Sequence, residues 1–150
     1  GKWKFSCVKS NGREHNYGGS GKDATCEAPN GTQPASGPGG KVYILFQNQG
    51  VRADKSLGGG VVYCYDPAKT VYGQTPEPDW YCPVKGDCAQ SGMGVALGED
   101  GTVYAATQKT GSVAAHVTAI SAQGVKRWEH AADGDINGVP AVDDQGFVYY

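Results

Sequence analysis

The sequence predicts an all-β protein built from units of four antiparallel strands, and three observations lead to this class. Short runs rich in Val, Tyr, Thr and Ile are bounded by Gly, Asp, Asn, Gln or Ser, and none keeps a helical period. The 24 Gly and 8 Pro are spread along the chain, which favours many tight turns. The pattern that opens at Gly101 opens again at Gly146, 45 residues later (146 minus 101). Four strands repeated at about this period are typical of a β-propeller blade.

The repeat unit 101–145 contains four runs of strand length. We expect strands at 101–106, 117–120, 126–130 and 139–142, followed by a strand at 146–150 that opens a further unit. Each run is short and rich in β-branched or aromatic residues, as strands of a twisted sheet are.

An earlier unit, 40–100, repeats the same order with longer connections. Its expected strands are 40–45, 62–66, 80–82 and 93–97. The unit is 61 residues long (101 minus 40), and the excess lies in the connections 47–59 and 67–78. Loops accept insertions more readily than strands do, so the two units remain comparable.

The remaining segments complete a partial propeller. We expect 1–39 to hold the third and fourth strands of a preceding blade and a Gly/Pro-rich loop. The chain would then supply about two and a half blades, whereas closed propellers have about four to eight. We therefore expect one propeller domain that is a fragment, or one that other chains complete.

The repeat resembles that of the pyrroloquinoline-quinone-type (PQQ-like) propeller family. The likeness is carried by Gly124 with Trp128, by 140–143 and by 146–149. The turn at 121–124 is shorter than in the family and lacks its Asp and Thr. The resemblance implies an alternative function, part of a PQQ-dependent quinoprotein dehydrogenase, in which PQQ and calcium lie on the central axis.

Composition excludes several classes of function. A net charge of −2 gives no reason to expect nucleic acid or an anionic membrane as partner, and no apolar run is long enough to span a membrane. The sequence has no nucleophile elbow and no phosphate-binding loop. We assign no catalytic residue, and an enzyme is the less favoured interpretation.

The cysteines align between the units. Cys7 follows Phe5 as Cys82 follows Trp80, and Cys26 and Cys88 precede their next unit by similar distances. We expect the disulfides Cys7–Cys26 and Cys82–Cys88, with Cys64 as a buried thiol, because no metal-ligand spacing is present. Disulfides favour an oxidising compartment, the periplasm, the cell surface or the exterior.

One segment resembles a calcium loop. Asp133, Asp135, Asn137 and Asp144 occupy positions 1, 3, 5 and 12 of the pattern, with Gly138 at position 6. Position 12 is Asp where such loops have a bidentate Glu, and a strand is expected at 139–142. An ordinary Asp/Asn/Gly turn is the favoured interpretation, with calcium as the other.

Aromatic residues divide into two groups. Phe5, Trp80 and Trp128 recur at one position of the repeat, which indicates a structural wedge between blades. Trp3 and Tyr72 fall outside the repeat and are candidates for a surface contact. Asn30 begins an Asn-Gly-Thr glycosylation sequon.

These observations favour a non-enzymatic extracytoplasmic module that binds a protein or a glycan, or serves as a scaffold, without a cofactor. We expect its long connections to lie at the rims of the ring, where propellers bind partners. A third hypothesis is a self-assembling extracellular structural protein, in which copies of the chain pair through open sheet edges.

Overall fold

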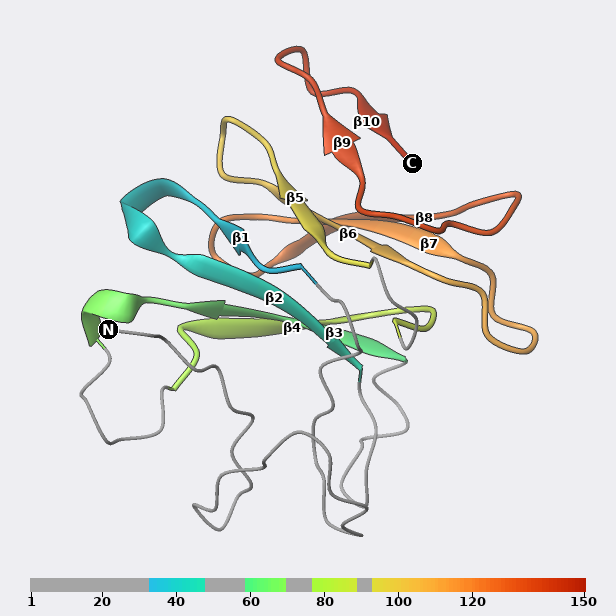
Figure 1. Cartoon of the computed structure of the whole chain (residues 1–150), viewed down its shortest axis with the longest axis horizontal. Helices are drawn as coiled ribbons and strands as arrows, with labels where there is room; N and C mark the ends of the chain where they lie inside the picture. The colour runs from blue at the N-terminus through green and yellow to red at the C-terminus, as the bar shows by residue number, and fades with distance from the viewer. Residues whose placement is uncertain (1–32, 48–58, 70–76, 89–92) are drawn as a thin grey trace, which may run out of the picture.

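The computed structural model describes residues 33–47, 59–69, 77–88 and 93–150. Within these ranges the chain forms ten strands and two short 3-10 turns (Figure 1). The strands are β1 (Ala35–Ser36), β2 (Val42–Gln47), β3 (Gly60–Tyr65), β4 (Trp80–Val84), β5 (Val95–Leu97), β6 (Val103–Thr107), β7 (His116–Ile120), β8 (Lys126–Ala131), β9 (Ala141–Val142) and β10 (Val148–Tyr149). The 3-10 turns are η1 (Pro38–Gly40) and η2 (Pro67–Lys69). No helix in these ranges has the length and apolar character that a membrane crossing requires.

The strands form two four-stranded antiparallel sheets and a two-stranded hairpin. The first sheet has the order β1-β2-β3-β4 and the second the order β5-β6-β7-β8, while β9 pairs with β10. In Figure 1 the two sheets lie face to face and the β9–β10 hairpin stands beyond the second. The prediction of an all-β chain with four-stranded antiparallel units is confirmed.

Each sheet begins one strand earlier than the unit that the sequence predicts. The expected bounds of the units, 40–100 and 101–145, are therefore corrected. We expected 93–97 to close the earlier unit, but β5 pairs with β6 and so begins the second sheet. Likewise β1, within 1–39, pairs with β2, and β9 pairs with β10. The reason is connection length: five residues separate β5 from β6, and tight turns join strands that are hydrogen-bonded neighbours.

The strands β1, β5 and β9 begin side by side. Gln33 and Gly94 form a parallel bridge, with the Gln33 N–H donating to the Met93 carbonyl at 3.1 Å. A Cβ built on Gly94 would lie 3.0 Å from Val139 Cγ2. The steps from 33 to 94 and from 94 to 139 are the repeat spacings of 61 and 45 residues. Three successive units therefore meet along their first strands.

The two sheets match residue for residue across their last three strands. In each sheet a Tyr, a small residue and a Trp lie opposite one another on adjacent strands. These sets are named the Trp80 rung (Tyr43, Cys64, Trp80) and the Trp128 rung (Tyr104, Ala119, Trp128). The Tyr and Trp ring centroids are 5.9 Å apart in both rungs, with interplanar angles of 48° and 45°. The alignment of these strands from the sequence is confirmed at single-residue level.

The hydrophobic core lies between the two sheets. Strands alternate their side chains between faces, so one face of each sheet can pack against the other. Fully buried side chains come from both: Leu45, Val62 and Val84 from the first sheet, and Val103 and Ile120 from the second. Burial of each contributes roughly 1.5–3 kcal/mol.

A charged cluster joins the edges of the two sheets. The Glu129 carboxylate lies 2.8 Å from Lys126 Nζ on the same strand and 3.2 Å from Lys85 Nζ, just after β4. Thr107 Oγ1 donates to the Lys85 carbonyl at 2.5 Å. Burial opposes charge on Glu129, but hydrogen bonds from Lys126 and Lys85 outweigh it and lower the pKa of Glu129 to about 2.

The strand ends that the two long connections join lie at opposite ends of the first sheet. The connection 47–59 joins β2 to β3, and the connection 67–78 joins β3 to β4. Successive connections of an antiparallel meander alternate between the two ends of the sheet, because the chain reverses direction at each one. Most residues of both connections lie outside the described residues, so their place at the rims stays a prediction.

Candidate functional site

Four connections of the chain adopt one turn structure. In each, the first N–H donates to the fifth carbonyl and the fourth N–H donates to the first carbonyl, at 2.8–3.1 Å. The turns are 37–41, 98–102, 121–125 and 143–147. Their fourth residues are Gly40, Gly101, Gly124 and Gly146, with φ between 75° and 85°. Only glycine adopts this conformation without strain, which explains the recurring Gly of the repeat.

Two of these turns are closed by a side chain at their first position. Asp143 Oδ1 accepts hydrogen bonds from the N–H groups of Gln145 and Phe147 at 3.0 and 2.8 Å. Ser121 Oγ accepts from the corresponding groups, those of Gln123 and Val125, at 3.3 and 3.2 Å. Such local bonds fix a turn before any tertiary contact forms.

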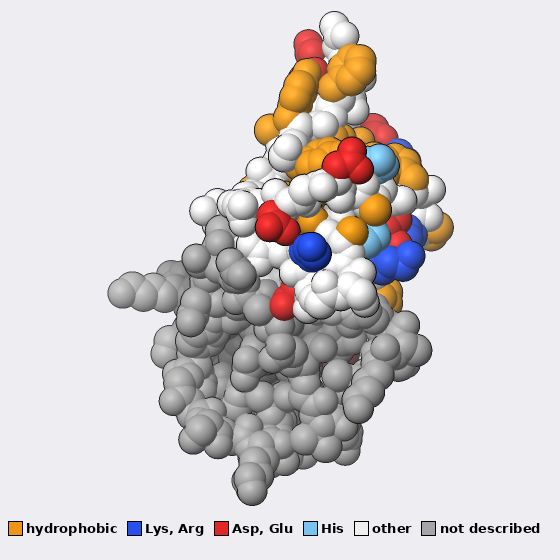
Figure 2. Space-filling view, turned by 90° about the vertical axis from the view of Figure 1, so that its right-hand side faces the viewer, with side chains coloured by type: hydrophobic (Ala, Val, Ile, Leu, Met, Phe, Trp, Pro, Cys, Tyr) orange, Lys and Arg blue, Asp and Glu red, His pale blue; other side chains and the backbone are white. Residues whose placement is uncertain are grey.

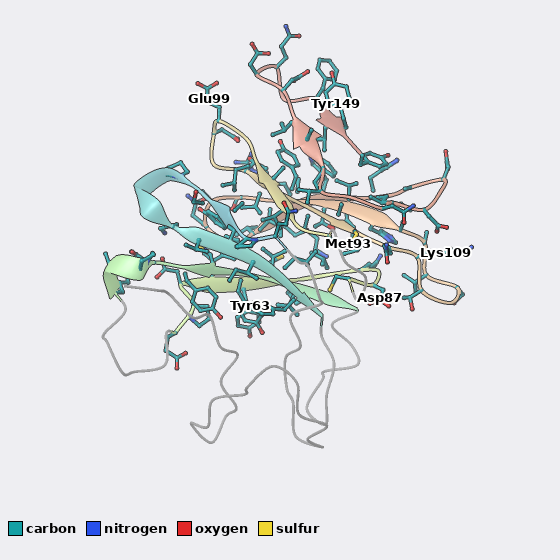
Figure 3. The ribbon with its side chains drawn as sticks, in the orientation of Figure 1. Tyr63, Asp87, Met93, Glu99, Lys109 and Tyr149 are labelled. Atoms are coloured by element: carbon teal, nitrogen blue, oxygen red, sulfur yellow. The ribbon has the colours of Figure 1, made fainter. Side chains whose placement is uncertain are left out.

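Three of the turns surround a shallow depression, which is the candidate site. They follow β1, β5 and β9, so each comes from an equivalent place in its unit. The depression has a volume of about 530 Å³ and is lined by Ser36, Gly37, Pro38, Leu97, Gly98, Glu99, Val142, Asp143 and Asp144. In Figure 3 the labelled Glu99 stands at this end of the sheets, and Tyr149 lies on the neighbouring hairpin.

The lining is acidic. Glu99, Asp143 and Asp144 contribute carboxylates, and none of the lining residues is Lys or Arg. Desolvation opposes charge on Asp143, but hydrogen bonds from the Phe147 N–H and the Tyr149 hydroxyl outweigh it and lower its pKa. The site can therefore accept hydrogen bonds from a ligand.

The turn at 98–102 is held by its neighbours. Asp100 accepts from the Thr102 hydroxyl and N–H at 2.7 and 2.9 Å, and from Arg127 at 2.9 Å. These bonds, led by the Thr102 hydroxyl, lower the pKa of Asp100 to about 2. Because Arg127 comes from β8, the opposite edge strand of the second sheet anchors the turn.

The structure separates the four residues of the calcium-loop pattern. Asp133 and Asp135 line a second depression of about 250 Å³ together with Lys109, whereas Asp144 lines the first. Asn137 Oδ1 accepts from Gln108 Nε2 at 3.3 Å. Within the described ranges no group of three or more His, Cys, Asp or Glu could hold a metal ion. Calcium binding by this loop stays a prediction from the sequence.

The expected bridge between Cys82 and Cys88 is not formed. In the described part of the chain, Cys64, Cys82 and Cys88 are three separate buried thiols. Cys82 lies opposite Val62, while the Cys88 sulfur is 3.5 Å from the position of a Cβ on Gly60. The two cysteines thus lie beside positions two residues apart on β3, about 6.5 Å along the strand.

The two tryptophans of the repeat that the structure describes, Trp80 and Trp128, hold equivalent positions in their rungs but have different neighbours. Trp80 Nε1 donates to the Ala122 carbonyl at 3.0 Å, and its ring lies over Gly124, so it packs against the second sheet as a wedge. Trp128 is 44% exposed. The sequence predicted the position of the wedge but not its partner, because a contact between sheets leaves no periodic pattern.

Several predicted residues lie outside the described residues. They are Trp3 and Tyr72 of the surface contact, Phe5 of the wedge, Asn30 of the sequon, and Cys7 and Cys26 of the other disulfide. The acidic depression was not predicted as a site, although Asp144 was singled out for another reason. The sequence feature that could have pointed to the depression is the Gly that recurs in each turn. This Gly marks equivalent turns but does not show that the turns lie close together.

Comparison with protein-family models and with curated protein sequences found no match for this chain.

Proposed function

We propose that this chain is part of a β-propeller and acts as a non-enzymatic binding or scaffold module for a protein or glycan partner. The acidic depression formed by the three turns is its binding site. Three turns from equivalent positions line one depression, and this observation carries the proposal. Equivalent turns of successive units are held in place by the packing of the sheets and not by a single loop. Their side chains are therefore well suited to contact a partner in a fixed geometry.

The stacking of the sheets supports the propeller. Two four-stranded sheets lie face to face, and β1, β5 and β9 follow one another at the repeat spacing. Trp80 joins the outer strand of the first sheet to a turn of the second. In a ring of blades, each sheet packs face to face against the next, and contacts of this kind are needed at every boundary between units.

The lining of the depression favours partners that donate hydrogen bonds. Carboxylates of Glu99 and Asp144 can accept from sugar hydroxyls or from N–H groups of a protein. The Leu97 and Val142 side chains add apolar contact between them. This combination of a few polar groups and apolar surface is common at ligand sites.

A binding screen with matched variants tests this proposal. Glycan and peptide arrays are probed with the wild-type chain, with Glu99→Ala plus Asp144→Ala, and with Lys109→Ala at the other depression. We expect a ligand whose binding falls at least about tenfold in the double variant, or about 1.4 kcal/mol, and is unchanged in Lys109→Ala. Ligands that bind all three proteins equally would overturn the assignment of the site. Dye-linked dehydrogenase turnover with PQQ and calcium would overturn the non-enzymatic function.

The oxidising compartment is part of the proposal and rests on Cys7, Cys26 and the Asn30 sequon. A mass measurement before and after reduction, on protein alkylated in denaturant, tests it. We expect two of the five thiols to stay blocked until reduction. Five thiols that alkylate without reductant would remove the support for an extracytoplasmic location.

A further inference from the structure

The second depression lies at the other end of the second sheet from the acidic one. It has a volume of about 250 Å³. One wall is the connection between β6 and β7, with Lys109 and Ser112, and the other is the connection after β8, with Asp133 and Asp135. In Figure 3 the labelled Lys109 and Glu99 stand at opposite ends of the sheets. The two depressions are therefore separate sites.

Hydrogen bonds and a buried side chain hold the two walls in place. In the first wall, Thr110 and Val113 exchange two backbone hydrogen bonds of 2.9 Å. The Ala132 N–H donates to the Ala115 carbonyl at 2.8 Å, which joins the second wall to the first. Just beyond the second wall, the Ile136 side chain is 4% exposed and belongs to the core. The depression is thus positioned by the sheet and the core, as a ligand site requires.

The two walls carry opposite charges that are not paired with each other. Lys109 contributes an ammonium to one wall, and Asp133 and Asp135 contribute carboxylates to the other. Among the residues that the structure describes, none of these three side chains forms an ion pair or a hydrogen bond with another residue. Figure 2, which views this end of the molecule, shows basic and acidic side chains close together among small and polar groups. Both signs of charge are therefore available to a ligand.

The volume of the depression limits the size of that ligand. The rest of the lining consists of Ser, Ala and Gly, so no large side chain fills the space beside the charged groups. A water molecule in the liquid takes about 30 Å³, so the depression has room for about eight waters, or for a ligand of about eight non-hydrogen atoms. The occupant is therefore a small molecule and not a glycan chain or a protein surface.

The charges of the lining select the class of small molecule. A metal ion alone would be repelled by Lys109, and an anion alone would be repelled by Asp133 and Asp135. A molecule with one carboxylate and one ammonium would instead find a partner for each group. The α-amino acids with small side chains carry both groups and have about the number of atoms that the volume allows.

We propose that the second depression binds a free α-amino acid with a small side chain. Lys109 pairs with its carboxylate, and Asp133 and Asp135 pair with its ammonium group. The Ala and Gly residues of the lining leave room for its side chain. This site depends neither on the acidic depression nor on how the units of the chain are arranged.

Titration of the ¹⁵N-labelled 150-residue chain with glycine, L-alanine, L-serine and L-threonine tests the proposal. The readout is the pair of backbone N–H signals of Ser112 and Gly134, one from each wall. We expect both signals to shift and to saturate with at least one of the four amino acids. The variants Lys109→Met and Asp133→Asn plus Asp135→Asn should each raise the Kd at least about tenfold, because each removes the partner of one charged group. These side chains are exposed, so the variants should keep the fold.

Two analogues and one control variant make the outcome decisive. The N-acetylated form of the bound amino acid lacks the ammonium group, and its amide lacks the carboxylate. Both should bind at least about tenfold more weakly than the amino acid itself. Glu99→Gln, at the acidic depression, should bind the amino acid as the wild type does.

Three results would overturn the proposal. They are the absence of saturable shifts with all four amino acids, equal binding of either analogue, and unchanged binding by the Lys109 or Asp133/Asp135 variants. A glycan or peptide whose binding is lost with Glu99→Ala plus Asp144→Ala reports separately on the proposed function.

Discussion

The indole N–H of Trp80 donates a 3.0 Å hydrogen bond to the carbonyl of Ala122, which lies 42 residues later in the chain. This bond joins the edge strand of one sheet to a turn of the next. Gly124 lies under the same indole, in a left-handed conformation with φ of 83°. The contact therefore combines a donor, an acceptor and a residue without a side chain, and a change to any of the three should weaken the packing of the sheets.

Replacing Gly124 by alanine should destabilise the chain strongly. The new Cβ would lie 2.7 Å from the Trp80 ring and would also occupy a conformation that is strained for L residues. We expect a loss of about 2–4 kcal/mol in the free energy of unfolding, measured by urea titration.

Gly146→Ala is the matched control for this variant. Its φ is 85°, nearly that of Gly124, but a Cβ there would meet nothing within 4 Å. It should lose only the conformational part, about 1–2 kcal/mol. Equal losses in the two variants would mean that the indole does not press on Gly124.

The two tryptophans should differ in their contribution to stability despite the matching Tyr–Trp geometry of their rungs. Trp80→Phe removes the indole N–H and leaves the Ala122 carbonyl without this donor, at a cost of about 1–3 kcal/mol. Trp128→Phe changes an exposed ring and should cost less than about 0.5 kcal/mol. Thermal and urea unfolding of both variants measure this difference, and a larger loss for Trp128→Phe would refute the assignment.

The stability that Glu129 contributes by joining the two sheets should be lost at acidic pH. Its pKa is lowered from 4.5 to about 2 in the folded chain, so the unfolded state takes up protons first as pH falls. Its contribution is therefore complete above about pH 5 and declines as pH falls towards 2. Allowing for solvent screening, we expect the contribution to be about 1–2 kcal/mol.

Glu129→Gln isolates this effect. The variant should be less stable than the wild type at pH 7, and the difference between them should shrink as pH falls from 5 to 2. Asp100 also has a pKa of about 2, but it titrates in both proteins and cancels in the difference. A difference that stayed constant over this range would show that the Glu129 charge contributes nothing to folding.

The described cysteines should behave as shielded thiols. Burial raises the pKa of the Cys88 thiol to about 12, with a smaller effect from Asp87, and burial also raises the pKa values of Cys64 and Cys82. Thiolate is the reactive form, so alkylation of the native chain at pH 8 should leave all three unmodified. In denaturant without reductant all three should react, as peptide masses would report. Cys82 and Cys88 that react only after reduction would restore the bridge that the structure lacks.

The sequence was sufficient to predict the strands and their equivalence. Val117 to Ser121 and Val62 to Asp66 were aligned from composition and spacing, and the rungs of Trp80 and Trp128 confirm that alignment. The division of the strands into sheets was harder to predict. We assigned β5 to the wrong sheet, because a repeating sequence can be divided into units at any strand.

The site was harder to predict than the strands. The depression is lined by Glu99 and Asp143, which come from different units and are 44 residues apart in the chain (143 minus 99), and only the stacking of the units brings them to one depression. The Cys82–Cys88 bridge was wrong because equivalent positions in two units do not fix the distance between two sulfur atoms. Contacts between sheets depend on three-dimensional packing that a periodic pattern does not record.

Hydrogen exchange of the indole N–H groups tests the central claim most directly, namely that units of this chain stack through a tryptophan and a glycine turn. One ¹⁵N-labelled sample reports on Trp80 and Trp128 together. We predict that the Trp80 indole N–H exchanges slowly, because Ala122 accepts it between the sheets, and that the Trp128 indole N–H exchanges fast. Fast exchange at both would contradict the stacking of the sheets.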